Sequence, residues 1–457
     1  MTSLISQLAA MPNLRVAPKA RRAPLLFVGS YTHEVPFVKG GTNPKLGEGV
    51  CCFAVKTEGE ALTLTRIELQ GAPPPSAFGE NPTYIAAGPM GAGIVVANEE
   101  YAAAAGGGVR AFAIERGEAE DNVALTAVGG LGDTGGVACC HVSVLSDKST
   151  IFAANYMSGS VCAFAIDPTT GGIGERTRHI QHPPVAAEEG EVGSRVLDRQ
   201  EGPHAHMALV LRGYDAADVD IVAVPDLGAD AVLLYPVVPV TNDDDATSSS
   251  TAAAAAWTLA ATPSQSLPLP LGSGPRHVAE SPNRRWLFVA CELSSTVVVF
   301  PRTDKRTGDG EEGGASAPLY RGAATYDVDA AHAPVSTLPA GVATGDGFST
   351  TAAIRVHPSG DFVYVSNRGH DSIAVLAVDE ATGALTLLTT VSTQGAAPRD
   401  FALHTPSPTS PTFLLAANQD SDNIVGFVIA AADGGVPRPI DGCVVPCNTP
   451  VSLCVVR

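Results

Sequence analysis

Charged residues are scarce in this chain of 457 residues, and basic ones are the scarcer kind. Only 16% of the residues are charged, with 28 Lys and Arg against 47 Asp and Glu, which gives a formal net charge of −19. Such a surface repels nucleic-acid phosphates and anionic lipid headgroups. We therefore expect no binding to nucleic acid or membrane surfaces, and any anionic ligand must meet a local cluster of basic side chains.

Long hydrophobic runs and paired cysteine motifs are also missing. No apolar run approaches the length that crosses a bilayer, and no secretory signal pattern is present. The nine cysteines are an odd number and include no paired C-x-x-C spacing, which favours reduced thiols over a disulfide framework or a metal-binding motif. These absences indicate an intracellular, cytoplasmic protein.

The first 24 residues leave two interpretations of the N-terminus open. They contain Arg15, Lys19, Arg21 and Arg22 but no acidic residue. Residues 1–24 are therefore either a flexible leader or a transit segment that would direct the protein to an organelle.

One pattern recurs seven times along the rest of the chain. In the copy over residues 274–300, a short segment after a proline (G-P-R-H-V-A) precedes an apolar strand (W-L-F-V-A-C-E-L) and then another (S-S-T-V-V-V-F). The second strands of the copies end in matched tetrads, at residues 28–31, 96–99, 153–156, 223–226, 289–292, 365–368 and 416–419.

Strand units that repeat every ~40 to 60 residues are typical of a β-propeller, whose blades stack radially because none can bury its faces alone. The seven tetrads predict an all-β protein, a propeller of seven four-stranded antiparallel blades. A second-strand segment at 25–31 opens the repeats and an entry-strand segment at 449–456 closes them. We expect these two segments to complete one blade and close the ring.

The repeats indicate a single domain over residues 25–457. Three stretches interrupt them, at about 183–200, 240–271 and 303–351, and their low-complexity composition predicts surface insertions between blades.

Candidate site residues come from equivalent positions in different blades, because the entry strands of a propeller line its channel and the connections at one mouth converge. The last residues of the tetrads form one ring: Tyr31, Glu99, Tyr156, Asp226, Glu292, Arg368 and Gln419. The entry strands supply a second ring: His141, His204, His206, Arg276, His277, Arg399 and Asp400. Arginines, histidines and carboxylates in this number predict an anion-binding site with acid–base groups.

Several of these residues have structural explanations as well. His204 and His206 alternate along a strand and can point at one ligand, or their rings can be satisfied by backbone carbonyls. Arg399 and Asp400 can pair locally. A metal site with His141 as third ligand is disfavoured because the neighbouring arginines would repel a cation, so we expect no metal and no cofactor.

The sequence resembles the lactonase family of seven-bladed propellers, which contains bacterial propeller-type 6-phosphogluconolactonases and fungal 3-carboxy-cis,cis-muconate cyclases. The resemblance spans about residues 25–456. The segments that carry it are G-P-H-A-H at 202–206, P-D-L-G at 225–228, G-P-R-H at 274–277, E-L-S-S at 292–295, S-N-R-G-H-D-S-I at 366–373, P-R-D-F at 398–401 and A-N-Q-D-S-D-N at 417–423.

The resemblance implies a catalytic group of one histidine, two arginines and a glutamate. The matching positions are His204 or His206, Arg276, Glu292 and Arg368. The chain departs from the other copies at Pro225 and Cys291, where most tetrads have Asn, at Met207 after the histidine pair, and in its long insertions.

A mechanism follows for opening a sugar lactone without a cofactor. A histidine or Glu292 activates water, and the histidine is the better base near neutral pH unless burial raises the pKa of the glutamate. Arg276 stabilises the charge on the attacked carbonyl, and Arg368 with Arg399 holds a phosphate or carboxylate. We expect His141, Asp226 and Gln419 to complete substrate binding.

The leading hypothesis is a monomeric 6-phosphogluconolactonase-like hydrolase of the pentose phosphate pathway, as the resemblance implies. Two alternatives stay open. One is a muconate-type lactonising cyclase that uses the same arginines for substrate carboxylates. The other is a non-catalytic propeller that serves as an interaction scaffold.

Overall fold

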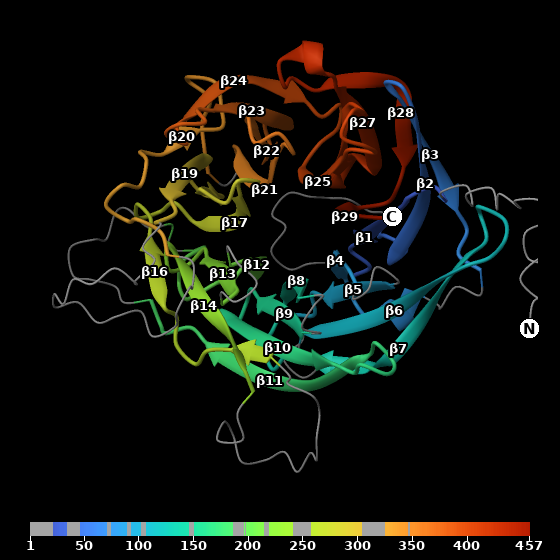
Figure 1. Cartoon of the computed structure of the whole chain (residues 1–457), viewed down its shortest axis with the longest axis horizontal. Helices are drawn as coiled ribbons and strands as arrows, with labels where there is room; N and C mark the ends of the chain where they lie inside the picture. Colours follow the sequence, from blue (N-terminus) through green and yellow to red (C-terminus); the bar gives the residue numbers. More distant parts are fainter. Residues whose placement is uncertain are drawn as a thin grey trace, which may run out of the picture.

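Seven antiparallel sheets are arranged in a ring in the computed structural model (Figure 1). The structure describes residues 22–33, 46–70, 75–88, 93–101, 107–145, 150–185, 196, 198–213, 219–240, 257–303, 325–345 and 348–457. Residues 1–21 of the expected leader lie outside these ranges. In the part of the chain so described, no helix is long and apolar enough to span a membrane.

Each blade is named here from its innermost strand outward. Blade one is β29 (Pro450–Val456), β1 (Leu25–Ser30), β2 (Val50–Glu58) and β3 (Ala61–Ile67); blade two is β4 (Pro82–Ala87), β5 (Gly93–Asn98), β6 (Gly108–Arg116) and β7 (Val123–Asp133); blade three is β8 (Cys139–Leu145), β9 (Thr150–Asn155), β10 (Ser160–Ile166) and β11 (Ile173–Gln181).

The remaining blades follow the same order. Blade four is β12 (Leu209–Leu211), β13 (Ile221–Asp226), β14 (Ala231–Pro239), β15 (Trp257–Leu259) and β16 (Gln265–Pro268); blade five is β17 (Pro275–Glu280), β18 (Trp286–Cys291), β19 (Thr296–Pro301) and β20 (Val335–Ser336); blade six is β21 (Thr350–Val356), β22 (Phe362–Arg368), β23 (Ser372–Val378) and β24 (Leu385–Ser392); blade seven is β25 (Pro398–His404), β26 (Thr412–Asn418), β27 (Asn423–Ile429) and β28 (Arg438–Pro446).

The ring closes within blade one, as the sequence predicted. β29, from the C-terminal end of the chain, pairs antiparallel with β1, from its N-terminal end, with Leu25 opposite Val456 and Gly29 opposite Ser452. Figure 1 shows the C-terminus beside β1. Residues more than 400 positions apart therefore share one sheet, so the ring has no open edge at this seam.

The core of the molecule lies between blades. The second strand of nearly every blade is buried along its whole length. Phe288 and Val299 of blade five pack in one cluster with Val365 and Leu376 of blade six. Such strands are apolar on both faces because a neighbouring blade covers each face, which explains why their sequences read as continuous hydrophobic runs.

Buried asparagines fix the ends of several second strands. Asn98 donates its side-chain amide to the carbonyl oxygens of Phe78 (2.6 Å) and Glu80 (3.1 Å), and Asn418 donates to the carbonyl of Thr393 (3.1 Å). The residue that follows each asparagine is thereby held at one mouth of the ring.

Two of the expected insertions contribute strands to the blades. Within residues 240–271, β15 and β16 both pair with β14. Within residues 303–351, β20 pairs with β19 and the first residues of β21 pair with β22. Composition alone did not reveal the outer strands β15, β16 and β20 or the start of the innermost strand β21, because their pairing partners lie in other strands of the blade.

Candidate active site

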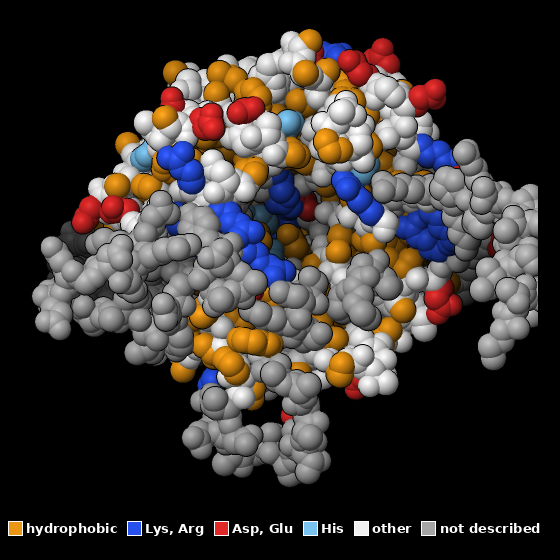
Figure 2. Space-filling view, viewed as in Figure 1, with side chains coloured by type: hydrophobic (Ala, Val, Ile, Leu, Met, Phe, Trp, Pro, Cys, Tyr) orange, Lys and Arg blue, Asp and Glu red, His pale blue; other side chains and the backbone are white. Residues whose placement is uncertain are grey.

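The candidate site lies at the mouth where the second strands end and the innermost strands begin. Glu292 directly follows β18, Arg276 lies at the start of β17, and Arg368 ends β22. The strand register places Pro275 opposite Cys291, and this pairing brings Arg276 close to Glu292. Figure 2 shows one face of the ring, with Lys and Arg side chains beside a hollow near its middle.

Three arginines surround the Glu292 carboxylate. Arg199 Nη2 lies 2.6 Å from Oε1, while Arg276 Nε and Arg368 Nη2 lie 2.9 and 3.0 Å from Oε2. Burial alone would raise the pKa of Glu292, but Arg368, Arg199 and Arg276 hold that pKa well below its ordinary value. Glu292 is therefore an ionised counter-ion and a weak base at neutral pH.

Arg276 is the innermost of the three arginines. Its side chain is only 3% exposed, and its Nη1 donates to the carbonyl oxygen of Ala352 at 2.8 Å. Burial, Arg399 and Arg368 lower the pKa of Arg276 to about 10. The guanidinium consequently keeps its charge at neutral pH and is held rigidly at the bottom of the mouth.

A second carboxylate, Glu99, holds the fourth arginine. Its oxygens accept hydrogen bonds from Tyr31 Oη (3.1 Å) and Tyr101 Oη (2.5 Å), and Arg399 Nη2 lies 3.8 Å from Oε2. The Arg399 guanidinium also lies over the Tyr31 ring, 5.4 Å from its centroid. We call Arg199, Arg276, Arg368 and Arg399, together with Glu292 and Glu99, the arginine cluster.

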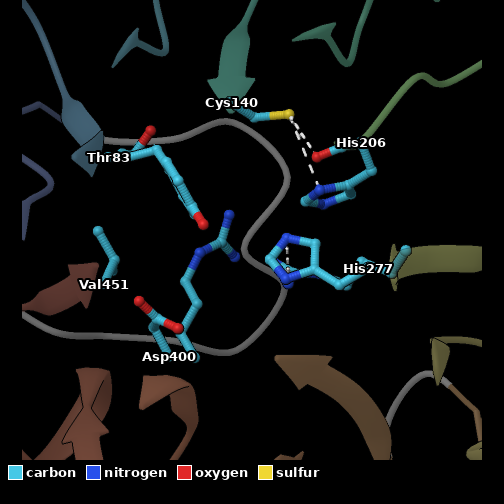
Figure 3. Close-up of a pocket in the computed structure, with 9 residues that line it drawn as sticks. Thr83, Cys140, His206, His277, Asp400 and Val451 are labelled. Atoms are coloured by element: carbon cyan, nitrogen blue, oxygen red, sulfur yellow. Dashed lines mark hydrogen bonds between the residues drawn. The ribbon is translucent and has the colours of Figure 1, made fainter. Parts of the chain in front are cut away.

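His206 lines a small pocket beside this cluster. Figure 3 shows His206, His277 and Cys140 on one side of the pocket, facing Thr83 and Val451. Burial and the neighbouring Arg276 lower the pKa of His206 well below 6.5. Its imidazole is therefore neutral at neutral pH and carries a free lone pair, while the lowered pKa makes it a weaker base than an ordinary histidine. The pocket is lined by Thr83, Tyr84, Cys140, His206, Arg276, His277, Arg399, Asp400 and Val451.

The structure separates the two histidines of the H-x-H pair. His204 stacks on Tyr156, with ring centroids 4.6 Å apart, and its Nε2 lies 3.1 Å from Glu201 Oε1. The innermost strand of this blade is interrupted, because Ala205 forms an isolated bridge and β12 starts only at Leu209. Only His206 of the pair lines the pocket.

Asp226 has a fully buried side chain with structural partners. Its Oδ1 accepts hydrogen bonds from the backbone N–H groups of His204 (2.7 Å) and Ala229 (3.0 Å), and its Oδ2 lies 2.5 Å from His182 Nδ1. This network holds the start of blade four in place. Asp226 therefore supports the segment that carries the histidines.

His141 lies on blade three, in β8, and Gln419 follows β26 of blade seven. His141 is buried against Tyr84, with centroids 4.1 Å apart, and its Nδ1 accepts the N–H of Ala208 at 3.3 Å. Gln419 follows β26, and its Nε2 donates to Asp420 Oδ1 at 3.2 Å. Across the described ranges, no group of three or more His, Cys, Asp or Glu side chains is placed to hold a metal ion.

Arg399 and Asp400 do not form the ion pair with each other that their neighbouring positions in the sequence allowed. Asp400 Oδ1 accepts a hydrogen bond from Arg355 Nη2 of blade six at 2.8 Å, and its Oδ2 accepts the N–H of Leu453 at 2.9 Å. Both residues line the pocket, and a bulge interrupts the strand register between Pro398 and Asp400, so the two side chains reach different partners.

Sequence reasoning missed Arg199. The residue lies in the 183–200 stretch, which was interpreted as an insertion, and it belongs to no repeat. The one feature of the sequence that could have indicated Arg199 as a site residue is its position, three residues before the G-P-H-A-H segment of blade four.

Fold and site together define a seven-bladed propeller with a cationic pocket at one mouth. The chain belongs to the lactonase family: the model described as "Lactonase, 7-bladed beta-propeller" matches residues 25–455. A 6-phosphogluconolactonase of Bacillus subtilis (strain 168) is 32% identical to it over 405 residues, which cover 88% of this chain and 90% of that protein.

Solved structures share the fold. A Lactobacillus plantarum protein matches with a TM-score of 0.67 at 24% identity and covers 95% of this chain and 100% of its own. The periplasmic gluconolactonase of Pseudomonas aeruginosa matches with a TM-score of 0.66 at 23% identity and covers 95% of this chain and 99% of its own.

Proposed function

We propose that this chain hydrolyses 6-phosphogluconolactone, opening the ring ester with water. The class of enzyme, a lactone-opening carboxylic ester hydrolase, follows from membership of the lactonase family. The similarity to the Bacillus subtilis enzyme supports the phosphorylated sugar lactone as substrate, and with it a place in the pentose phosphate pathway.

The arginine cluster is the observation that carries the proposal. It holds two more guanidinium groups than carboxylates, although the whole chain has a formal charge of −19. A phosphate monoester carries close to two negative charges at neutral pH. The charge of the cluster therefore matches the anionic group of the proposed substrate.

The residues suggest a division of roles in the reaction. His206, neutral at neutral pH, takes a proton from the water that attacks the ester carbonyl carbon. Arg276 stabilises the negative charge that develops on the carbonyl oxygen. The bond from the carbonyl carbon to the ring oxygen then breaks, the ring oxygen takes up a proton, and the product is a hydroxy acid.

Binding of the phosphate is assigned to Arg368 and Arg399, which lie on blades six and seven. Both are partly exposed at the mouth, with side-chain exposures of 20% and 15%. Guanidinium groups bind phosphate oxygens in pairs of parallel hydrogen bonds. In this scheme Glu292 orients three arginines and does not act as the base.

Substitution of the two strand-borne arginines tests the proposal. Arg276→Gln should lower kcat/KM for 6-phosphogluconolactone by about 100-fold or more, because removal of one charge-stabilising donor costs this much in other enzymes. Arg368→Gln should lower kcat/KM by about 10- to 100-fold, mainly through KM, because a charged hydrogen bond to the phosphate is lost. The uncatalysed opening of the lactone must be measured and subtracted. Arg285→Gln is the control, since Arg285 lies at the opposite end of β18 from Glu292.

Two outcomes would contradict the proposal. Unchanged turnover in both variants would remove the arginine cluster from the reaction. Turnover of a carboxylated muconate, with no activity on the phosphorylated lactone, would instead identify a lactonising cyclase.

A further inference from the structure

We infer that Arg199 is a specificity-determining residue that binds the anionic group of the substrate. This inference rests on the proposed lactonase function. The catalytic group implied by the resemblance contains only two arginines, Arg276 and Arg368, and both lie on strands. Arg199 is a third arginine on the same carboxylate and comes from a loop.

The loop that carries Arg199 is fixed to blade four by its next residue. Gln200 is buried, and its Nε2 donates to the carbonyl oxygen of Leu227 at 2.8 Å. Its Oε1 accepts the N–H of Val196 at 3.0 Å. Glu201, the next residue, is held in turn by a contact of its Oε1 with His204 Nε2 at 3.1 Å. The Arg199 backbone therefore has a defined position on the rim.

From this anchor the Arg199 side chain reaches two other blades. Its Nη2 contacts Glu292 Oε1 of blade five at 2.6 Å and donates to Tyr156 Oη of blade three at 3.3 Å. Although burial opposes it, the Glu292 carboxylate raises the pKa of Arg199. The guanidinium is thus charged and aimed at the same point as Arg276 and Arg368.

The three arginines on Glu292 lie at different depths. Side-chain exposure rises from 3% for Arg276 to 20% for Arg368 and 24% for Arg199. Arg276 Nη1 also donates a hydrogen bond to the backbone carbonyl oxygen of Ala352. An anionic group that enters the mouth reaches Arg199 and Arg368 before Arg276.

This order of depth predicts different effects on binding and chemistry. Arg276 lies beside His206 in the pocket and is placed to act on the reacting carbonyl. Arg199, at the entrance, is placed to bind the phosphate through charge-assisted hydrogen bonds. A lactone without an anionic group gains nothing from Arg199, so this residue should set the preference for the phosphorylated substrate.

The test compares Arg199→Gln and Arg199→Lys with the wild type on 6-phosphogluconolactone and on unphosphorylated gluconolactone. Arg199→Gln should raise KM for the phosphorylated lactone about 10- to 100-fold, the usual effect of losing a charged hydrogen bond, with kcat changed less than about threefold. Activity on gluconolactone should stay within about twofold of the wild type, and Arg199→Lys should recover part of the lost affinity.

Arg176→Gln is the matched control. Arg176 is another arginine with a carboxylate partner, Asp133, 3.8 Å away, but it is exposed and lies on the outermost strand of blade three. This variant should leave both activities unchanged. Equal losses on the two lactones in Arg199→Gln would mean that Arg199 acts only by holding Glu292, and would overturn the inference, as would an unchanged KM.

Binding measurements separate this inference from the proposed function. If the wild-type protein hydrolyses neither lactone above the uncatalysed rate, the proposed function fails. Calorimetric titration with 6-phosphogluconate and with gluconate then decides the role of Arg199. The inference stands if Arg199→Gln weakens binding of the phosphorylated acid alone, and falls if it weakens both equally or neither.

Discussion

At the scale of single residues, the environment of Glu292 decides which group acts as the base. A buried glutamate can become a base through a raised pKa, and three contacts with guanidinium groups produce the opposite effect here. Burial and Arg276 also lower the pKa of His206, so its imidazole is neutral but a weaker base than an ordinary histidine. The proposed choice of His206 as base rests on position: His206 lines the pocket beside Arg276, whereas both oxygens of Glu292 are held by arginines.

The pH dependence of kcat should report this assignment. His206 must be neutral to accept a proton, and its pKa lies well below 6.5. Activity should therefore persist as the pH falls below 6.5 and should drop only as the pH falls through the lowered pKa. His206→Asn should lose most of kcat at every pH, whereas His204→Asn should retain more of it.

A pH profile of kcat from 4.5 to 8 checks this expectation. An acidic limb centred at pH 6.5 or higher, or one that is unchanged in His206→Asn, would show that another group is the base.

Physical reasons explain why some site residues could be predicted from the sequence and others could not. Arg276, Glu292 and Arg368 meet because the repeat fixes strand register, and register fixes where each strand end lies. The sequence left open whether His204 and His206 point at one ligand, as alternate residues of a regular strand do. They do not, because this strand is interrupted at Ala205. Arg199 could not be found by alignment, because its loop has no counterpart in the other repeats.

At the scale of secondary-structure elements, buried asparagines tie several second strands to a loop that precedes their blade, through Asn98, Asn367 and Asn418. Asn418 is completely buried, and its amide donates to Thr393 O and to Asn423 Oδ1. Removing this side chain leaves the Thr393 carbonyl without that partner. The site depends on such contacts, because the residue after each asparagine faces the mouth.

Asn418→Ala should lower the free energy of unfolding by about 1–3 kcal/mol, the usual cost of an unsatisfied buried polar group. Urea unfolding followed by circular dichroism measures the change. Asn122→Ala, at an exposed position, is the control and should change stability by less than about 0.5 kcal/mol. Equal stabilities of the two variants would contradict the proposed role of the buried asparagines.

Sequence was a better guide to the inner strands than to the outer ones. Inner strands carry continuous hydrophobic runs because neighbouring blades cover both of their faces. Outer strands are partly exposed, as in β11, where only one face contacts the core and the hydrophobic pattern fades. The same reason explains β15, which follows a low-complexity stretch and has only three residues.

At the scale of the whole molecule, the ring concentrates positive charge at one point of an acidic protein. Arginines from blades five, six and seven and from the loop before blade four converge on Glu292 and Glu99. A recessed site lined by one sign of charge focuses the electric field toward an anionic ligand. The seven repeats predicted this convergence, because equivalent positions of a closed ring face a common mouth.

The arginine cluster is proposed to bind the anionic substrate. A crystal structure of the protein with bound 6-phosphogluconate, the expected product, tests this placement most directly. We predict the sugar acid carboxylate beside Arg276 and His206, and the phosphate within hydrogen-bond distance of Arg368 and of Arg199 or Arg399. A phosphate bound away from the arginine cluster, or a ligand at the opposite face of the ring, would contradict it.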